Sequence, residues 1–164
     1  MRLKRKSKPW RGLLAGAVAG LAASFLMGPM HALAQKASPP RKKQKEDPTE
    51  KTAQAVSENV LNRRLTRTEK KAAGPLVHYL FGTAVGAIYG VAAETIPAVR
   101  TGYGSLFGTA VWLGAHVLVV PALGLSEPVT KSPVSIEAGE FGAHLVYGTV
   151  SEGLRRAVRS YVLR

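Results

Sequence analysis

Among the ionisable residues within apolar stretches of this chain, four are the candidates for chemistry: Glu94, His116, Glu140 and His144. Glu140 and His144 lie four residues apart, so on a helix they share one face, where a carboxylate and an imidazole can share a proton. Ionisable groups inside a lipid layer are functional candidates by default, because a charge is poorly solvated there. The cluster therefore predicts proton or small-solute handling within a membrane.

Other roles for these four residues remain open. Polar side chains in a membrane bundle also tie helices together, at about 0.6 to 2 kcal/mol each, and for Glu140 and His144 this structural role is as well supported as a functional one. Glu94 either reaches the membrane interface or pairs with Arg100. A metal ion is disfavoured, because E-x-x-x-H opposite a single histidine is an incomplete ligand set. No metal or cofactor is expected.

Long apolar segments must position these residues. Hydrophobic residues make up 46% of the 164-residue chain but gather in blocks, while the formal charge of +13 lies almost entirely outside them. A helix of about 20 apolar residues crosses a hydrocarbon layer of about 30 Å. Membrane-spanning helices are predicted at residues 12–34, 76–96, 104–124 and 134–154. The predicted fold class is an all-α membrane protein with four transmembrane helices in a glycine-rich antiparallel bundle.

The chain divides into a basic N-terminal flank, a first helix, a polar basic loop, a three-helix membrane core and a basic C-terminal tail, at residues 1–11, 12–34, 35–73, 74–154 and 155–164. Gly74 and Pro75 are expected to open the three-helix core. Within the polar loop, the apolar residues between 53 and 65 follow helical spacing. A short amphipathic helix on the membrane surface and a flexible tether are equally supported there.

The first apolar segment has two interpretations. The basic residues before it and Ala32-Leu33-Ala34 after it are typical of a cleaved signal peptide. Its length and its glycines at four-residue steps favour a retained membrane helix, which is the interpretation we prefer. Gly28 and Pro29 are expected to kink or end this helix.

Small residues recur at four-residue steps in the apolar segments. In lipid, a G-x-x-x-G step lets a neighbouring helix approach backbone to backbone. The residues predicted to pack helices in this way are Gly16, Gly20, Gly82, Gly86, Gly90, Gly104, Gly108 and Gly148.

The fourth apolar segment is the most polar one, because it contains Glu137, Glu140, His144 and Glu152. An acidic residue near the centre of an isolated span costs roughly 2.5 to 3.5 kcal/mol on insertion scales. Glu140, His144 and Glu152 follow a four-residue step, so this stripe is expected to face the bundle interior. Glu152 is expected to pair with Arg156 at the favoured helical spacing.

Several short motifs together point to a known family. The strongest is EFGAHLV at residues 140–146, with Arg155-Arg156 behind it. The other matching residues are Pro39, Pro40 and Arg41; His78, Phe81, Tyr89, Ala93, Glu94 and Pro97; and His116, Pro121, Leu123, Gly124 and Leu125. On these residues the chain resembles the YagU-like bacterial inner-membrane proteins, a family without a characterised activity.

This resemblance covers most of the chain outside the polar loop. It implies a multi-pass protein of the bacterial inner membrane, with four helices and both termini cytoplasmic, and it supplies no reaction and no ligand. Basic residues on the two sides are balanced under this orientation. The amino-terminal basic cluster and the resemblance therefore decide the orientation.

Two functional hypotheses from different classes follow. The first is a small proton- or solute-handling protein that works as a homo-oligomer. The second is a non-catalytic scaffold or accessory subunit of a larger membrane complex, whose basic flanks bind anionic lipids of the bilayer. An enzyme is disfavoured, because the chain has no serine–histidine–acid pattern, nucleotide loop, zinc-protease motif or cysteine. A nucleic-acid partner is disfavoured because Trp10 and Phe25 are the only Phe, Trp or Tyr residues before Tyr79, so the basic runs are not interleaved with aromatic residues.

Overall fold

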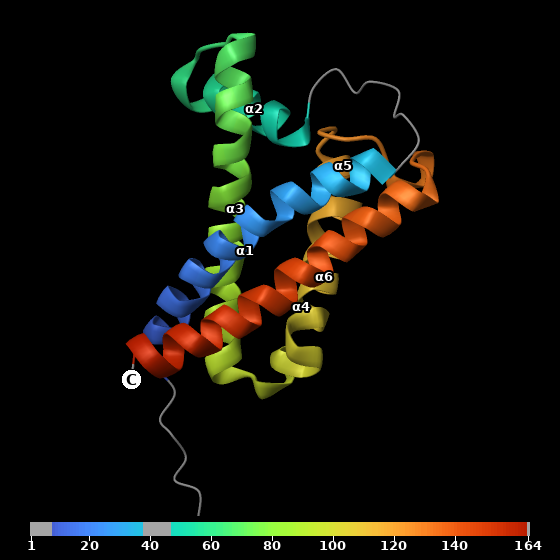
Figure 1. Cartoon of the computed structure of the whole chain (residues 1–164). Helices are drawn as coiled ribbons and strands as arrows, with labels where there is room; N and C mark the ends of the chain where they lie inside the picture. Colours follow the sequence, from blue (N-terminus) through green and yellow to red (C-terminus); the bar gives the residue numbers. More distant parts are fainter. Residues whose placement is uncertain (1–7, 38–46, 164) are drawn as a thin grey trace, which may run out of the picture.

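The computed structural model describes residues 8–37 and 47–163, without the side chains of residues 31, 32 and 34–37. The basic run at residues 1–7, the resemblance residues 39–41 and Arg164 lie outside the described residues. Within the described ranges the chain is helical and contains no strand (Figure 1). The all-α class predicted from the sequence is therefore confirmed.

Helices of different length and type follow one another along the chain. They are α1 (Pro9–Ala37), α2 (Pro48–Leu61), α3 (Arg67–Thr95), the 3-10 helix η1 (Pro97–Gly104), α4 (Ser105–Val111), the π-helix η2 (Trp112–Val119), α5 (Val120–Ala122), the 3-10 turn η3 (Val129–Lys131), α6 (Val134–Ala157) and the π-helical end η4 (Val158–Val162). The helices α4, η2 and α5 follow one another without a break, so they form one long rod.

Three helical stretches of the described chain are long and apolar enough to cross a membrane: Pro9–Met30, Arg67–Thr95 and Pro97–Ala122. They correspond to the first three predicted spans. The helix α6 is not among them, because its glutamates and arginines make it more polar. A fourth membrane span therefore stays a prediction.

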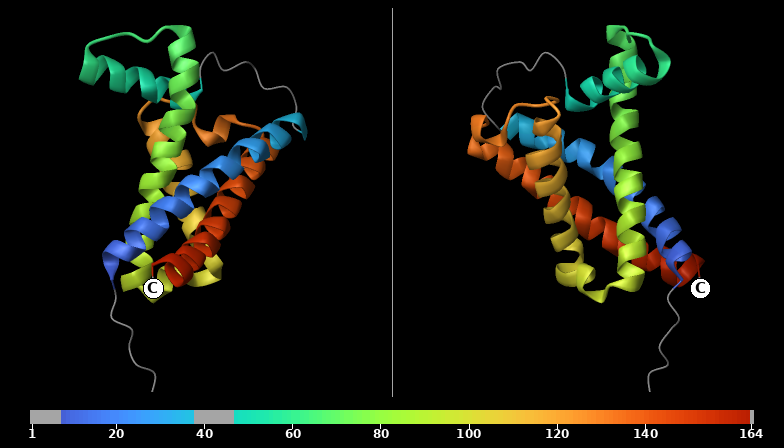
Figure 2. Two further views of the ribbon diagram at one scale, coloured as in Figure 1. Left: turned by 60° about the vertical axis from the view of Figure 1, so that its left-hand side comes forward. Right: turned by 180° about the vertical axis from the view of Figure 1, so that it is seen from behind.

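The helix α1 packs against both α3 and α6, and α6 also packs against α4 (Figures 1 and 2). Arg11 at the start of α1 donates a hydrogen bond to the carbonyl oxygen of Leu163 at 3.2 Å, so the two ends of the described chain meet. Consequently α1 and α6 run in opposite directions along their shared contact.

Glycines lie where these helices approach most closely. A Cβ atom on Gly16 would overlap the backbone of Gly86, and one on Gly20 would overlap the backbone of Gly82. The later glycine of α1 meets the earlier glycine of α3, so α1 and α3 are antiparallel. A second contact of this kind joins α6 to the start of α4, where a Cβ on Gly148 would lie 2.8 Å from the Cα of Gly108. At these positions any side chain would force the helices apart.

A small hydrophobic core lies between α1 and α6. Its buried members are Ala23, Met27, Ala143 and Tyr147, with Met30, Phe107, Val111 and Val150 packed against them. The hydroxyl of Tyr147 donates to the carbonyl oxygen of Gly82 at 2.6 Å, so this core is also fastened to α3.

The helix α3 begins at Arg67, seven residues before Gly74, which with Pro75 was predicted to open it. Thr66 and Glu69 form a capping box, in which each side chain accepts a hydrogen bond from the other residue's backbone N–H. This cap starts the helix at Arg67, and Pro75 then lies inside it. The expected boundary was wrong because the capping signal precedes the proline. The helix α1 likewise does not end at Pro29 but continues to Ala37.

The polar loop predicted at residues 35–73 contains the helix α2, so the helical alternative holds over Pro48–Leu61. Asp47 caps its start by accepting a hydrogen bond from the N–H of Thr49 at 2.8 Å, and Pro48 occupies the first helical position. Asn62 ends it in the left-handed conformation, with φ of 49°.

Candidate functional site

Two of the four predicted residues, His116 on η2 and His144 on α6, lie together in the structure. Their imidazole centroids are 5.9 Å apart. Glu140 lies one turn before His144, and its carbonyl oxygen is 2.7 Å from Nδ1 of that histidine. Glu94 lies elsewhere, near the end of α3, so the structure does not gather all four residues into one site.

The carboxylate that contacts His116 belongs to Glu137, which was not among the candidate residues. Oε2 of Glu137 lies 2.9 Å from Nε2 of His116, and the two side chains are only 15% and 26% exposed. Glu137 precedes His144 by seven residues, which is two helical turns, so both face the same side of α6. That spacing was present in the sequence and could have identified Glu137. We call His116, Glu137 and His144 the histidine cluster.

The helix that carries His116 has unusual geometry. Residues Trp112–Val119 form a π-helix, a rare form that is frequently found at functional sites. The indole of Trp112 lies nearly parallel to the His116 ring, at 6.3 Å between centroids, and packs edge-on against Phe141 of α6 at 5.0 Å. Aromatic rings therefore border the imidazole of His116 on one side.

Glycine packing sets the distance between the two helices of this cluster. A Cβ on Gly108 would lie 3.0 Å from the carbonyl carbon of His144 and 3.2 Å from the Cα of Leu145. The backbones of α4 and α6 therefore touch at the level of His144. Two turns beyond Gly108, this close approach brings His116 within reach of α6.

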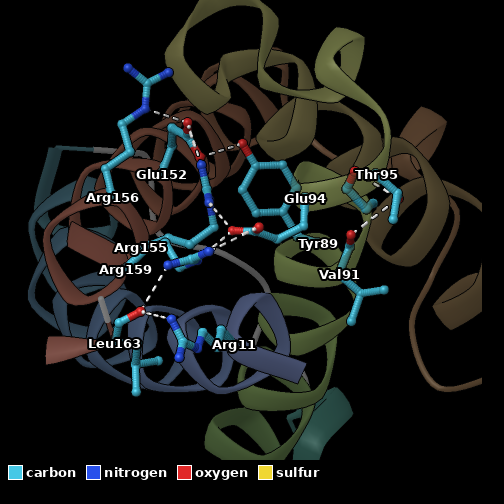
Figure 3. A network of polar contacts seen from close by, with 11 residues as sticks. Arg11, Tyr89, Val91, Glu94, Thr95, Glu152, Arg155, Arg156, Arg159 and Leu163 are labelled. Atoms are coloured by element: carbon cyan, nitrogen blue, oxygen red, sulfur yellow. Dashed lines mark hydrogen bonds and ion pairs between the residues drawn. The ribbon is translucent and has the colours of Figure 1, made fainter. Parts of the chain in front are cut away.

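A second cluster of polar side chains lies at the opposite end of α6. It joins α3 to α6 and η4 (Figure 3). Glu152 is fully buried and accepts hydrogen bonds from the hydroxyl of Tyr89 at 2.8 Å, from Nε of Arg155 at 2.8 Å and from Nε of Arg156. The expected pair of Glu152 and Arg156 is present, but it is one part of a larger buried network.

Glu94 belongs to this same network. Its carboxylate accepts from Nε of Arg159 at 2.8 Å and lies 3.9 Å from Nη1 of Arg155. These arginines, rather than the expected Arg100, are its partners, because the end of α6 passes beside the end of α3. Both Arg155 and Arg159 are buried. These arginines were predicted to belong to a basic C-terminal tail, so apart from the Glu152–Arg156 pair the network was not expected.

The histidine cluster and the arginine–glutamate network suit different functions. The arginine–glutamate network pairs each buried carboxylate with guanidinium groups, and buried ion pairs of this kind are costly to break because one charge is left uncompensated. The histidine cluster contains one carboxylate and two imidazoles, groups that can pass a proton among themselves. Among the described residues, no group of three or more His, Cys, Asp or Glu is arranged to hold a metal ion.

The fold and these polar groups define a class, namely an all-helical membrane protein with ionisable residues between its helices. A family model described as "Protein of unknown function (DUF1440)" matches residues 25–153. The chain therefore belongs to this family of uncharacterised, YagU-like proteins.

A curated relative supports this assignment. The chain is 29% identical over 87 residues to a protein of Escherichia coli (strain K12) named "Inner membrane protein YagU". The match covers 53% of this chain and 43% of the relative, so it spans less than half of the relative's length. No solved structure matches the chain.

Proposed function

We propose that this chain is a multi-pass protein of the inner membrane with four transmembrane helices, α6 being the fourth, and with both termini in the cytoplasm. The start of α1, the end of α3 and the end of α6 meet at one end, where Arg11 and Arg159 both donate to the carbonyl of Leu163 and Arg159 also binds Glu94. Four antiparallel crossings fit this arrangement. Arginines gather at that end, and together with the resemblance they support its assignment to the cytoplasmic side.

The polarity of α6 does not contradict a membrane location. Glu152 and Arg155 are buried against α3 and each other, and Glu137 is bonded to His116. A membrane helix can carry ionisable groups when they face the bundle interior and are paired there. The glycine contacts between α1 and α3, and between α4 and α6, are of the kind that drives helix association in lipid.

The activity that this geometry supports best is non-enzymatic proton handling by the histidine cluster. The observation that carries it is the 2.9 Å contact between His116 on a π-helix and Glu137 on α6, with a second imidazole 5.9 Å away. Each member can take up or release a proton, and the set lies between η2 and α6. Glu140, one turn from His144, extends the set along α6.

Proton flux into vesicles tests this function. Full-length protein is reconstituted into liposomes containing a pH-sensitive dye, and the decay of an imposed pH gradient is followed. The wild type is expected to dissipate the gradient, and Glu137→Gln and His116→Gln to lose this activity, because each removes a protonatable member of the pair. Glu127→Gln, on the exposed link before α6, is the matched control and should retain the flux. A wild type no faster than empty liposomes would overturn the proposal.

A second function is favoured by a different observation. In the span Pro97–Ala122, only 6% of the apolar 18-residue stretch is buried within the chain. Such an uncovered rod suits a scaffold or accessory subunit that docks onto a second copy or a larger membrane complex. Native mass spectrometry from lipid nanodiscs, together with the flux assay, distinguishes proton handling from a scaffold role. A scaffold is expected to appear as an oligomer or with a bound partner and to show no proton flux.

A further inference from the structure

The helix α2 lies at the level where α3 changes from polar to apolar. A Cβ on Gly74 of α3 would touch Thr49 and Glu50 of α2, at 3.1 Å and 3.2 Å, so α2 crosses α3 at Gly74. Before this point α3 carries Arg67, Glu69, Lys70 and Lys71, and after it no charged residue follows until Glu94. If α3 crosses a bilayer, its first apolar turn at Leu76 enters the hydrocarbon and α2 therefore lies at the depth of the lipid headgroups.

The direction of α2 suits that depth. In both views of Figure 2, α2 runs crosswise to α3 rather than alongside it. A helix crosswise to a membrane-spanning helix lies roughly in the plane of the membrane surface. Ala53 and Ser57 are buried, which fixes the side of α2 that packs on the protein.

The connection from α2 to α3 covers another side of α2. The N–H of Leu65 donates to the side chain of Gln54 at 3.0 Å, and the hydroxyl of Ser57 donates to the carbonyl of Arg63 at 2.8 Å. This connection runs from α2 to the start of α3, in the direction away from the bundle (Figure 1). The side of α2 near Gln54 therefore faces away from the membrane.

The opposite side of α2 is apolar and uncovered. Each residue turns an α-helix by about 100°, so Val56 lies almost opposite Gln54, and Val60 follows one turn later. Val56 and Val60 are 54% and 70% exposed. These two residues form an apolar edge on the side of α2 that faces the bundle's membrane zone.

Basic residues surround this apolar edge. Between Pro48 and Lys71 the chain has six Lys or Arg, namely Lys51, Arg63, Arg64, Arg67, Lys70 and Lys71, against the three acids Glu50, Glu58 and Glu69. Arg64 and Arg67 are exposed. Basic groups at a membrane surface are attracted to anionic phospholipids by about 1 kcal/mol each.

We propose that α2 is an interfacial helix that docks onto the bilayer surface through Val56 and Val60 and binds anionic phospholipid headgroups through the basic residues that follow it. The bilayer is the occupant that this edge fits, because α2 is tied to α3 at headgroup depth, lies in the membrane plane and combines an apolar edge with a net positive charge. This inference goes beyond proton handling and does not depend on it.

Spin labels on α2 test the docking. The chain contains no cysteine, so Val56→Cys and Glu58→Cys each provide one site for a nitroxide in the full-length protein. Glu58 is the matched control, because it is exposed and lies on the Gln54 side of the helix. The protein is reconstituted into phosphatidylcholine vesicles with and without phosphatidylglycerol, and collisions of each label with oxygen and with a water-soluble nickel chelate are compared.

In anionic vesicles, the label at position 56 is expected to lose collisions with nickel and gain them with oxygen, while the label at 58 stays accessible to nickel. Replacing Arg67 and Lys71 by glutamine (R67Q/K71Q) should weaken the preference for anionic vesicles by about fivefold for each positive charge removed. Equal nickel access at both positions in every vesicle would overturn the proposal. Shielding of position 56 from both reagents would also overturn it, because a protein rather than lipid would then cover the edge.

Discussion

The hydroxyl of Tyr89 on α3 donates a 2.8 Å hydrogen bond to the fully buried carboxylate of Glu152 on α6, across 63 positions of the sequence. The same carboxylate binds Arg155, whose side chain is also buried. The hydroxyl of α3 thus hydrogen-bonds an ionised carboxylate of α6 whose charge is neutralised by arginines of α6 itself. The direct link between α3 and α6 here consists of a few polar atoms.

Replacing Glu152 by glutamine should destabilise the protein strongly. The change leaves Arg155 buried with its main counter-charge removed, which typically costs about 3 to 5 kcal/mol. Unfolding in detergent, followed by circular dichroism against added denaturant, measures the loss. Glu58→Gln is the control, since Glu58 pairs with Arg64 on the exposed surface and such pairs contribute about 0 to 1 kcal/mol. Similar losses in both variants would contradict a buried network.

Tyr89→Phe should have a smaller effect that isolates the hydroxyl. The ring of Tyr89 stacks on Phe107 at 4.0 Å between centroids, and phenylalanine keeps this contact. The lost hydrogen bond to a buried carboxylate is expected to lower the free energy of unfolding by about 1 to 3 kcal/mol. Tyr103→Phe, at a half-exposed ring, is expected to change it little. If the two variants unfold alike, the Tyr89 contact does not stabilise the fold.

Two glycines of α6 should respond in opposite ways to alanine. A Cβ on Gly148 would lie 2.6 Å from the backbone nitrogen of Gly108, so Gly148→Ala should destabilise by about 1 to 3 kcal/mol through overpacking. On Gly142 the added Cβ would meet no described atom within 4 Å. Gly142→Ala should therefore be neutral or stabilise by up to about 1 kcal/mol through helix propensity. Equal effects on unfolding would show that α4 and α6 do not touch at Gly148.

The capping box of α3 should determine the local stability of the polar first turns of this helix. Thr66→Ala removes the acceptor for the N–H of Glu69, at a typical cost of about 1 kcal/mol. Hydrogen exchange of the backbone amides in residues 67–73 should speed up by about fivefold, while exchange in the apolar part of α3 stays unchanged. Thr68→Ala, two residues further on, is the control. Unchanged exchange in Thr66→Ala would mean that packing on α2, and not the cap, holds these turns.

The fold class and the three apolar spans could be predicted from the sequence because they depend on properties of single segments. Length, composition and the grouping of apolar residues are local. The start of α3 was predicted wrongly because Pro75 was weighed above the cap formed by Thr66 and Glu69. The repeating glycines indicated close helix contacts, but a four-residue step alone does not determine which glycine opposes which.

The candidate site was predicted only in part for the same reason. His116 and His144 were both predicted to belong to one polar cluster, and their rings lie 5.9 Å apart. The seven-residue spacing of Glu137 and His144 placed both on one side of α6, but the choice of the carboxylate that contacts His116 also depends on the rotation of α6 and on the π-helical geometry of Trp112–Val119. The partners of Glu94 come from a helix about 60 residues away in the chain, so proximity to Arg100 misled the prediction.

The polar character of α6 has a consequence for how the protein is assembled. Its glutamates and arginines make it a poor candidate to leave the insertion machinery by itself, and the hydroxyl of Tyr89 and the carboxylate of Glu94 that receive them belong to α3. Since α3 is synthesised before α6, its polar groups are already in place when α6 emerges. If α6 crosses the membrane as proposed, its insertion is therefore expected to depend on α3, which supplies the polar partners of its charged residues.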